Sequence, residues 1–119
     1  MKKIELLAPA GSFECLKAAV NYGADAVYVG GNQFSARAFA NNFDAEAMKE
    51  AVEYCHLRNV RLFVTMNTLL NEFEIEKAVE MAKYYHSINV DALLIQDLGL
   101  YYRLVKECPQ MELHASLDF

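Results

Sequence analysis

The sequence predicts an α/β fold in which five parallel strands and four helices form the N-terminal half of a TIM-type (β/α) barrel. Short aliphatic runs alternate along the chain with stretches whose apolar residues recur at helical spacing. This alternation is typical of βαβ units, in which a helix connects two parallel strands of one sheet. The units occupy the whole sequence, so we expect residues 1–119 to be a single partial barrel domain that lacks the C-terminal half.

Five runs of apolar and β-branched residues, each followed by turn-forming residues, are expected to be the strands. They span Ile4–Ala8, Ala26–Gly30, Arg61–Met66, Ala92–Gln96 and Met111–Ser116. No linker or low-complexity segment separates them.

The first two helices have recognisable boundaries. Ser12 can accept a hydrogen bond from the first turn of one helix, which Gly23 ends with a left-handed cap. Asp44 is a similar cap for the second helix, which runs to about Arg58. The loop between the second strand and this helix, residues 31–43, is longer than the usual ~4–6 residues, which indicates a functional role.

The last two helices also carry start or stop signals. Asn71 with Glu74 three residues later predicts a capping box at the start of the third helix. The fourth helix is expected from Leu100 to about Glu107, because Pro109 cannot continue it.

Polar residues on one face of the strands favour a barrel over an open, doubly wound sheet. Glu112, His114 and Ser116 share one face of the fifth strand, and Thr65 and Gln96 lie on the corresponding face of their strands. An open sheet has helices on both faces, where each unpaired polar group would cost ~1–3 kcal/mol. A water-containing barrel lumen suits such a face better. The open sheet stays an alternative, because polar strand ends would line its crevice too.

The composition argues against nucleic acid, membrane and metal as partners of this segment. The net charge of −5 and pI near 5.1 argue against direct nucleic-acid binding by this segment. No run approaches the ~18 apolar residues of a membrane span, and residues 1–3 lead directly into a strand, so we expect a cytoplasmic protein without membrane contact. The three cysteines are an odd number without CxxC spacing, which predicts reduced thiols and no metal site.

Six short strings lie at the predicted strand ends and in the long loop. They are ELLAPAG at 5–11, DAVYVGG at 25–31, FSAR at 34–37, NTL at 67–69, QDLG at 96–99 and HAS at 114–116. In this order they resemble the N-terminal part of the catalytic region of peptidase family U32, the collagenase-like proteases. The family usually continues its fifth-strand motif with Thr-Gln, whereas this chain has Leu117 and Asp118.

The resemblance implies a (β/α) barrel and offers two activities. The first is that of a collagenase-like protease, a hydrolase of peptides. The alternative is prephenate-dependent hydroxylation of tRNA or rRNA bases, as in many family members. Members of that kind carry an iron–sulfur cluster on cysteines beyond the fifth strand, so the resemblance implies no cofactor within this chain. We therefore expect a fragment of an enzyme that is inactive by itself.

Barrel enzymes carry their catalytic groups at the C-terminal ends of strands and in the loops that follow. By this rule the candidate catalytic residues are His114, Asn67 and Gln96, and the candidate substrate-binding residues are Arg37, Tyr28, Ser116 and Asp97.

Each candidate has a chemical role and a plainer alternative. His114 suits proton transfer or ligand contact, against a hydrogen-bonded structural role. Arg37 suits bidentate binding of a carboxylate, against an ordinary surface position. Asn67 and Gln96 can orient a neutral ligand or connect loops, and Asp97 can instead cap the fourth helix.

Established protease arrangements are not found in the sequence. Ser116 and His114 are two apart on one strand and have parallel side chains, and no G-x-S-x-G elbow is present. The histidines also lack the H-E-x-x-H spacing of a zinc protease.

The expected partners are a small-molecule carboxylate or a peptide, together with a second protein surface. A barrel opened at the first and fifth strands leaves unpaired backbone groups at both edges. We therefore expect a homodimer or a domain-swapped assembly. A non-catalytic half-barrel interaction module is the rival hypothesis from another functional class.

Overall fold

The computed structural model describes residues 6–31, 45–66 and 71–115. The strands are β1 (Leu7–Ala10), β2 (Ala26–Gly30), β3 (Arg61–Met66), β4 (Ala92–Ile95) and β5 (Glu112–Ala115). The helices are α1 (Phe13–Asn21), α2 (Ala45–Leu57), α3 (Glu72–Ser87) and α4 (Leu98–Glu107). Among these described residues, no helix is long and apolar enough to cross a membrane.

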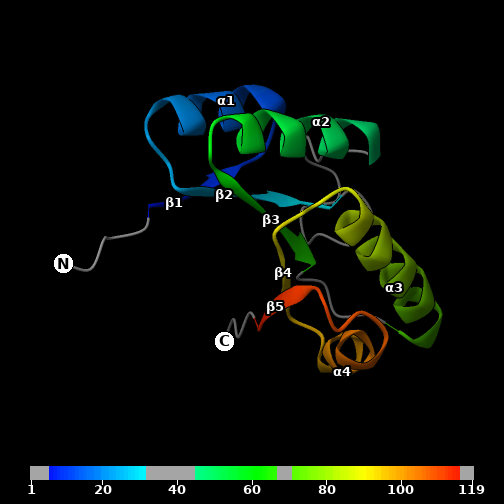
Figure 1. Cartoon of the computed structure of the whole chain (residues 1–119). Coiled ribbons are helices and arrows are strands. Elements are labelled where there is room, and N and C mark those ends of the chain that lie inside the picture. Colours follow the sequence, from blue (N-terminus) through cyan, green and yellow to red (C-terminus); the bar gives the residue numbers. More distant parts are fainter. Residues whose placement is uncertain (1–5, 32–44, 67–70, 116–119) are drawn as a thin grey trace.

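All five strands are parallel and lie in the sheet order β1-β2-β3-β4-β5. Figure 1 shows the four helices on one side of a sheet that turns progressively from β1 to β5. The opposite side carries no helix from the part of the chain that the structure describes. An open doubly wound sheet would have helices on both faces. The predicted fold class, half of a (β/α) barrel, is confirmed.

The main core fills the space between the sheet and its helices. Strand residues Val27, Val29, Leu62, Val64 and Leu93 are fully buried there. The helices contribute residues at helical spacing: Leu16, Met48, Ala51, Val52, Cys55, Ala78, Val79, Ala82, Leu100 and Leu104. Each fully buried aliphatic side chain stabilises the fold by ~1.5–3 kcal/mol. This single layer of helices therefore fixes which face of every strand is buried beneath the helices and which face points away from them.

The predicted strand and helix bounds are close to the observed ones. The second and third strands match residue for residue. The first strand begins at Leu7 and continues through Pro9, which pairs with Tyr28, because an edge strand tolerates proline. The fourth strand ends at Ile95, one residue early, and α4 begins at Leu98 rather than Leu100.

Three predicted helix boundaries are confirmed by their hydrogen bonds or backbone angles. Ser12 Oγ accepts a hydrogen bond from the backbone N–H of Cys15 at 3.2 Å, and Gly23 follows α1 with a φ of 95°. Asn71 and Glu74 form the expected capping box at the start of α3. Asp44, the expected cap of α2, lies outside the described residues.

Asn59 and Asn89 follow the last turns of α2 and α3 and end these helices. Their role was not predicted from the sequence. Both adopt left-handed backbone angles, with φ of 60° and 71°. Asparagine tolerates this region better than other non-glycine residues. Each helix can therefore reverse directly into the next strand.

Two aspartates fix the beginnings of neighbouring strands. Asp25 Oδ2 accepts a hydrogen bond from the backbone N–H of Leu6 at 2.7 Å. Asp91 Oδ2 accepts one from the backbone N–H of Leu62 at 2.7 Å and lies 2.7 Å from His56 Nε2. Each carboxylate thus connects the start of its own strand to the start of an adjacent strand.

Replacing Asp91 with Ala should lower the free energy of unfolding by ~1–3 kcal/mol, because the Leu62 N–H loses its acceptor in a half-buried position. His56→Ala is the matched control, since it removes only the half-exposed pair and should cost less than ~1 kcal/mol. Urea unfolding followed by circular dichroism measures both. Equal losses for the two variants would contradict a structural role for the Leu62 bond.

Candidate functional site

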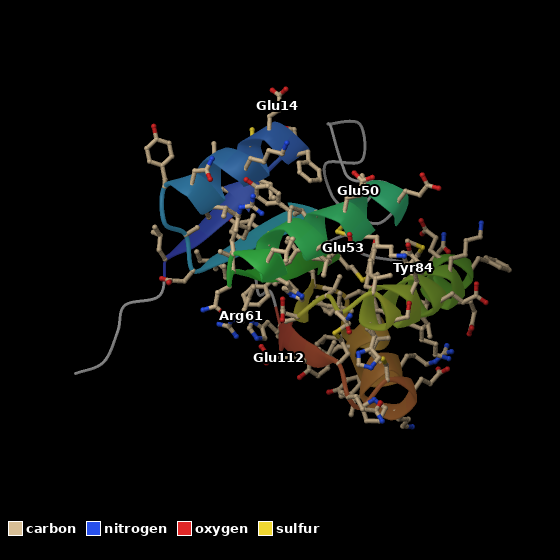
Figure 2. All side chains as sticks on the ribbon, turned by 45° about the horizontal axis from the view of Figure 1, so that its top comes forward. Glu14, Glu50, Glu53, Arg61, Tyr84 and Glu112 are labelled. Atoms are coloured by element: carbon tan, nitrogen blue, oxygen red, sulfur yellow. The ribbon has the colours of Figure 1, made fainter. Side chains whose placement is uncertain are left out.

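The candidate site is the face of the sheet that points away from the helices, which we call the lumenal face. Its described residues alternate with core residues along each strand: Leu7, Pro9, Ala26, Tyr28, Arg61, Phe63, Thr65, Ala92, Leu94, Glu112 and His114. Figure 2 shows Arg61 and Glu112 projecting from the sheet, away from Glu14 and Glu50 on the helices. In a complete barrel this face would surround the interior.

The centre of the lumenal face is apolar, which corrects the expectation of a strongly polar surface. Ala26, Phe63 and Ala92 are buried together, with Tyr28 and Leu94 packed against them. Phe63 pairs in register with Tyr28 on one side and Ala92 on the other. The small alanines leave room for the Phe63 ring over the sheet. The polar side chains therefore lie around this apolar cluster rather than across the whole face.

His114 lies beside the apolar cluster. Its Nε2 lies 2.7 Å from Glu112 Oε2, and the carboxylate accepts this hydrogen bond. Its ring also makes a T-shaped contact with the ring of Phe63, with ring centroids 5.5 Å apart and an interplanar angle of 61°. Phe63 belongs to β3 and His114 to β5, and alternate strands fill one interior layer in (β/α) barrels. This contact is the one expected for a barrel interior.

A hollow of about 220 Å³ opens on the lumenal face. Its walls are Leu7, Arg61, Phe63, Leu94 and His114. The Arg61 guanidinium lies 5.1 Å from the centre of the Phe63 ring, within the range of a cation–π contact. The hollow therefore combines a guanidinium and an imidazole around a largely buried aromatic ring. Such a set suits a planar ligand with polar or anionic groups at its rim.

The structure brings Tyr28 and His114 to the same face, as the alternation predicts. Gln96 is half-buried directly after β4. Asp97 is buried, and its Oδ1 accepts a hydrogen bond from the backbone N–H of Leu100 at 2.9 Å. The capping role considered for Asp97 is thus present, while ligand binding by Asp97 and Gln96 stays a prediction.

Three candidates, Arg37, Asn67 and Ser116, lie outside the described residues, so their roles also stay predictions. Arg61 and Phe63 were not predicted as site residues from the sequence. Counting back from Thr65 by the two-residue period of a strand could have found both.

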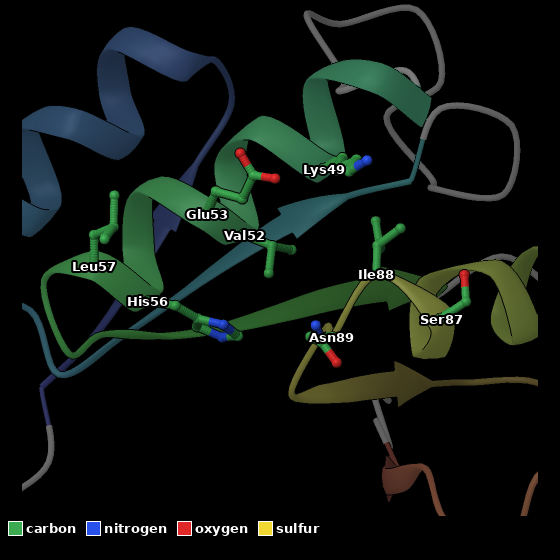
Figure 3. Close-up of a pocket in the computed structure, with 8 residues that line it drawn as sticks. All are labelled: Lys49, Val52, Glu53, His56, Leu57, Ser87, Ile88 and Asn89. Atoms are coloured by element: carbon green, nitrogen blue, oxygen red, sulfur yellow. The ribbon is translucent and has the colours of Figure 1, made fainter.

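A wider hollow of about 600 Å³ lies elsewhere, between α2 and the end of α3 (Figure 3). Val52, Leu57 and Ile88 form its apolar part, and His56 and Asn89 lie at one end. This hollow is on the outer, helical side of the sheet. It lies near the C-terminal ends of α2 and α3, which lead into the starts of β3 and β4. Chemistry in barrel enzymes occurs at the opposite, C-terminal ends of the strands. We assign the candidate site to the lumenal face because that face surrounds the interior of a barrel, although its hollow includes Leu7 and Arg61, the first residues of β1 and β3.

The thiols do not lie on the lumenal face. Cys55 packs among the helices, and burial, together with the nearby Asp91 carboxylate, raises the pKa of its thiol to about 11. Cys108 is buried in the same core, and Cys15 is exposed on α1. Among the described residues, no group of three or more His, Cys, Asp or Glu side chains could hold a metal ion. These residues therefore do not fit the ligand set of an iron–sulfur cluster.

At pH 8, iodoacetamide should label Cys15 rapidly and leave Cys55 and Cys108 unmodified until the chain is unfolded. The reason is that Cys15 is exposed, whereas Cys55 is buried and its pKa of about 11 keeps it protonated at this pH. Intact-mass and peptide mass spectrometry measure the labelling. Rapid modification of Cys55 in the folded chain would contradict its placement in the core.

The fold is shared with a solved barrel enzyme. The type I 3-dehydroquinate dehydratase of Clostridium difficile superposes with a TM-score of 0.68 at 15% sequence identity, and the match covers 94% of this chain and 50% of that one. At this identity the likeness shows the fold alone. It agrees with half of a TIM barrel.

Three curated relatives match nearly the whole chain. An uncharacterized protease of Methanocaldococcus jannaschii is 38% identical over 118 residues, the 23S rRNA 5-hydroxycytidine C2501 synthase of Escherichia coli is 40% identical over 114, and the tRNA hydroxylation protein P1 of Bacillus subtilis is 36% identical over 115. The matches cover 99%, 96% and 97% of this chain but only 28%, 17% and 27% of the relatives.

The family assignment is independent of any one relative. The family model described as Peptidase family U32 matches residues 11–118. This range includes every helix and four of the five strands completely. The chain therefore belongs to peptidase family U32.

Proposed function

We propose that this chain forms half of the substrate-binding barrel of an enzyme that hydroxylates a base in RNA. The observation that carries the proposal is the combination of Arg61, Phe63 and His114 around one hollow of the lumenal face. The names of the E. coli and B. subtilis relatives support the same class of substrate.

An aromatic ring between two nitrogen-rich side chains suits a flat heterocycle. Phe63 is only 4% exposed and the Arg61 guanidinium lies over its ring, so a base would stack on the planar guanidinium that the ring supports. Arg61 can donate hydrogen bonds to ring or carbonyl atoms at the rim of such a ligand, and Nδ1 of His114 can accept one while Nε2 donates to Glu112. A small carboxylate is the second ligand that this set could take, through the Arg61 guanidinium.

The Glu112–His114 pair would position the imidazole in this enzyme. The carboxylate accepts a hydrogen bond from Nε2 and so leaves Nδ1 to face a ligand. His114 would then hold or accept a proton at Nδ1 while the base is bound. The negative net charge fits contact with a single base rather than with the phosphate backbone. In our proposal, the RNA-binding and cofactor-binding parts lie outside these residues.

A collagenase-like peptidase is the second candidate, and it follows from the name of the M. jannaschii relative. A peptidase would need a nucleophile or a metal-activated water beside His114. The three thiols lie on or behind the helices, and the described residues hold no metal-ligating group. We favour base hydroxylation because the hollow around Arg61 and His114 suits a planar ligand.

The proposal can be tested by placing this chain in the E. coli synthase in exchange for the matching 114 residues. In cells that lack the native synthase, the chimaera should restore hydroxycytidine in 23S rRNA, measured by mass spectrometry of nucleosides. His114→Ala should lower the modified fraction at least ~100-fold if the imidazole transfers a proton. His86→Ala is the control, because His86 lies on α3 outside the lumenal face.

Two results would contradict the proposal. One is full hydroxylation by the His114→Ala chimaera. The other is a folded chimaera that leaves the rRNA unmodified but cleaves gelatin, which would favour the peptidase.

A further inference from the structure

The imidazole of His114 lies in an exposed position, where its hydrogen bond to Glu112 fixes its direction only weakly. The side chains of His114 and Glu112 are 45% and 53% exposed. A pair of exposed charged or polar side chains competes with water and contributes little to holding one geometry. The Glu112 carboxylate holds Nε2 at 2.7 Å, but it does not by itself set the plane of the ring. A second contact is needed for Nδ1 to point in one direction.

Phe63 provides this second contact from a rigid position. It is 4% exposed and belongs to the apolar cluster of the lumenal face. A ring that is packed on several sides in a buried cluster keeps one rotamer. The His114 imidazole makes its T-shaped contact with this ring at a centroid distance of 5.5 Å. Ring electrostatics favour such a tilted arrangement, so the fixed ring of Phe63 selects one plane for the imidazole.

Ala92 supplies the space for the contact between the two rings. It lies on β4, the strand between those that carry Phe63 and His114, and it is fully buried. It pairs in register with Phe63 on one side and with Glu112 on the other. Its side chain is a single methyl group. A larger side chain at this position would lie between the rings and separate them.

We propose that Phe63 is a positioning residue, which orients the His114 imidazole with Ala92 as the spacer between them. Glu112 holds Nε2, Phe63 sets the plane of the ring, and Nδ1 therefore faces the ligand. This role rests on the proposed function, in which His114 holds or accepts a proton at Nδ1. Phe63 acts through His114 and needs no contact with the reacting atoms. A displacement of about 1 Å in a reacting group can lower a rate ~100-fold.

The first measurement is the position of the ring proton of His114 in the 119-residue chain at pH 8, read from the nitrogen-15 NMR shifts of the two ring nitrogens. The unchanged chain should carry this proton on Nε2, which donates to Glu112. Phe63→Leu keeps an apolar side chain but removes the ring. It should lower the ratio of the Nε2–H to the Nδ1–H form roughly 5-fold, because a freely turning imidazole loses most of one hydrogen bond.

Ala92→Val is the second variant, because it keeps the Phe63 ring and separates it from His114. It should lower the same ratio, and it decides the question if circular dichroism shows that Phe63→Leu is unfolded. Phe13→Leu is the matched control. It removes an aromatic pair of the same T-shaped kind, with Tyr54 at a centroid distance of 5.8 Å, on the helical side of the sheet. This control should leave the ratio unchanged.

The second measurement is the hydroxylated fraction of 23S rRNA in cells that contain the chimaera with the E. coli synthase. Phe63→Leu and Ala92→Val should each lower it roughly 10-fold or more, whereas Phe13→Leu should not. An unchanged proton ratio in both lumenal variants would overturn the proposal, and so would an equal change in Phe13→Leu. If the ratio falls but the chimaera still hydroxylates fully, the proposed role of His114 in catalysis fails, while its orientation by Phe63 stands.

Discussion

The structure depends on the two-residue period of parallel strands that are covered by helices on one side only. Leu62 and Val64 are buried under the helices, whereas Phe63 between them is buried in a separate cluster on the other face. A one-residue shift of β3 would exchange these sets and bury Arg61 and Thr65 beneath the helices. The hydrogen bond from the backbone N–H of Leu62 to Asp91 Oδ2 opposes such a shift.

The lumenal face follows from this constraint and already shows the layering of a barrel interior. The ring of Phe63 on β3 reaches the imidazole of His114 on β5 across the intervening strand. Ala92, fully buried in β4, leaves the space through which this contact is made. The buried apolar centre supports the site, and Arg61 and His114 supply polar groups at its margin. In our proposal, this arrangement links the fold to recognition of a planar ligand.

Local signals in the sequence predicted much of the fold, because each depends on neighbouring residues. The Asn71–Glu74 capping box and the left-handed Gly23 are examples. The site was harder, because its contacts join residues that are far apart in the chain. Phe63 counted as one more apolar strand residue until its packing with His114 was known. Asn59 and Asn89 were overlooked because asparagine occurs in many other settings.

The most direct test is a set of NMR distance contacts in the 119-residue chain. We expect cross-relaxation between the ring protons of His114 and Phe63, whose centroids are 5.5 Å apart. We expect no contact from His114 to Leu100 or Leu104, which belong to the core beneath the helices. Contacts from His114 to these leucines, without any to Phe63, would show that the lumenal face is wrongly assigned.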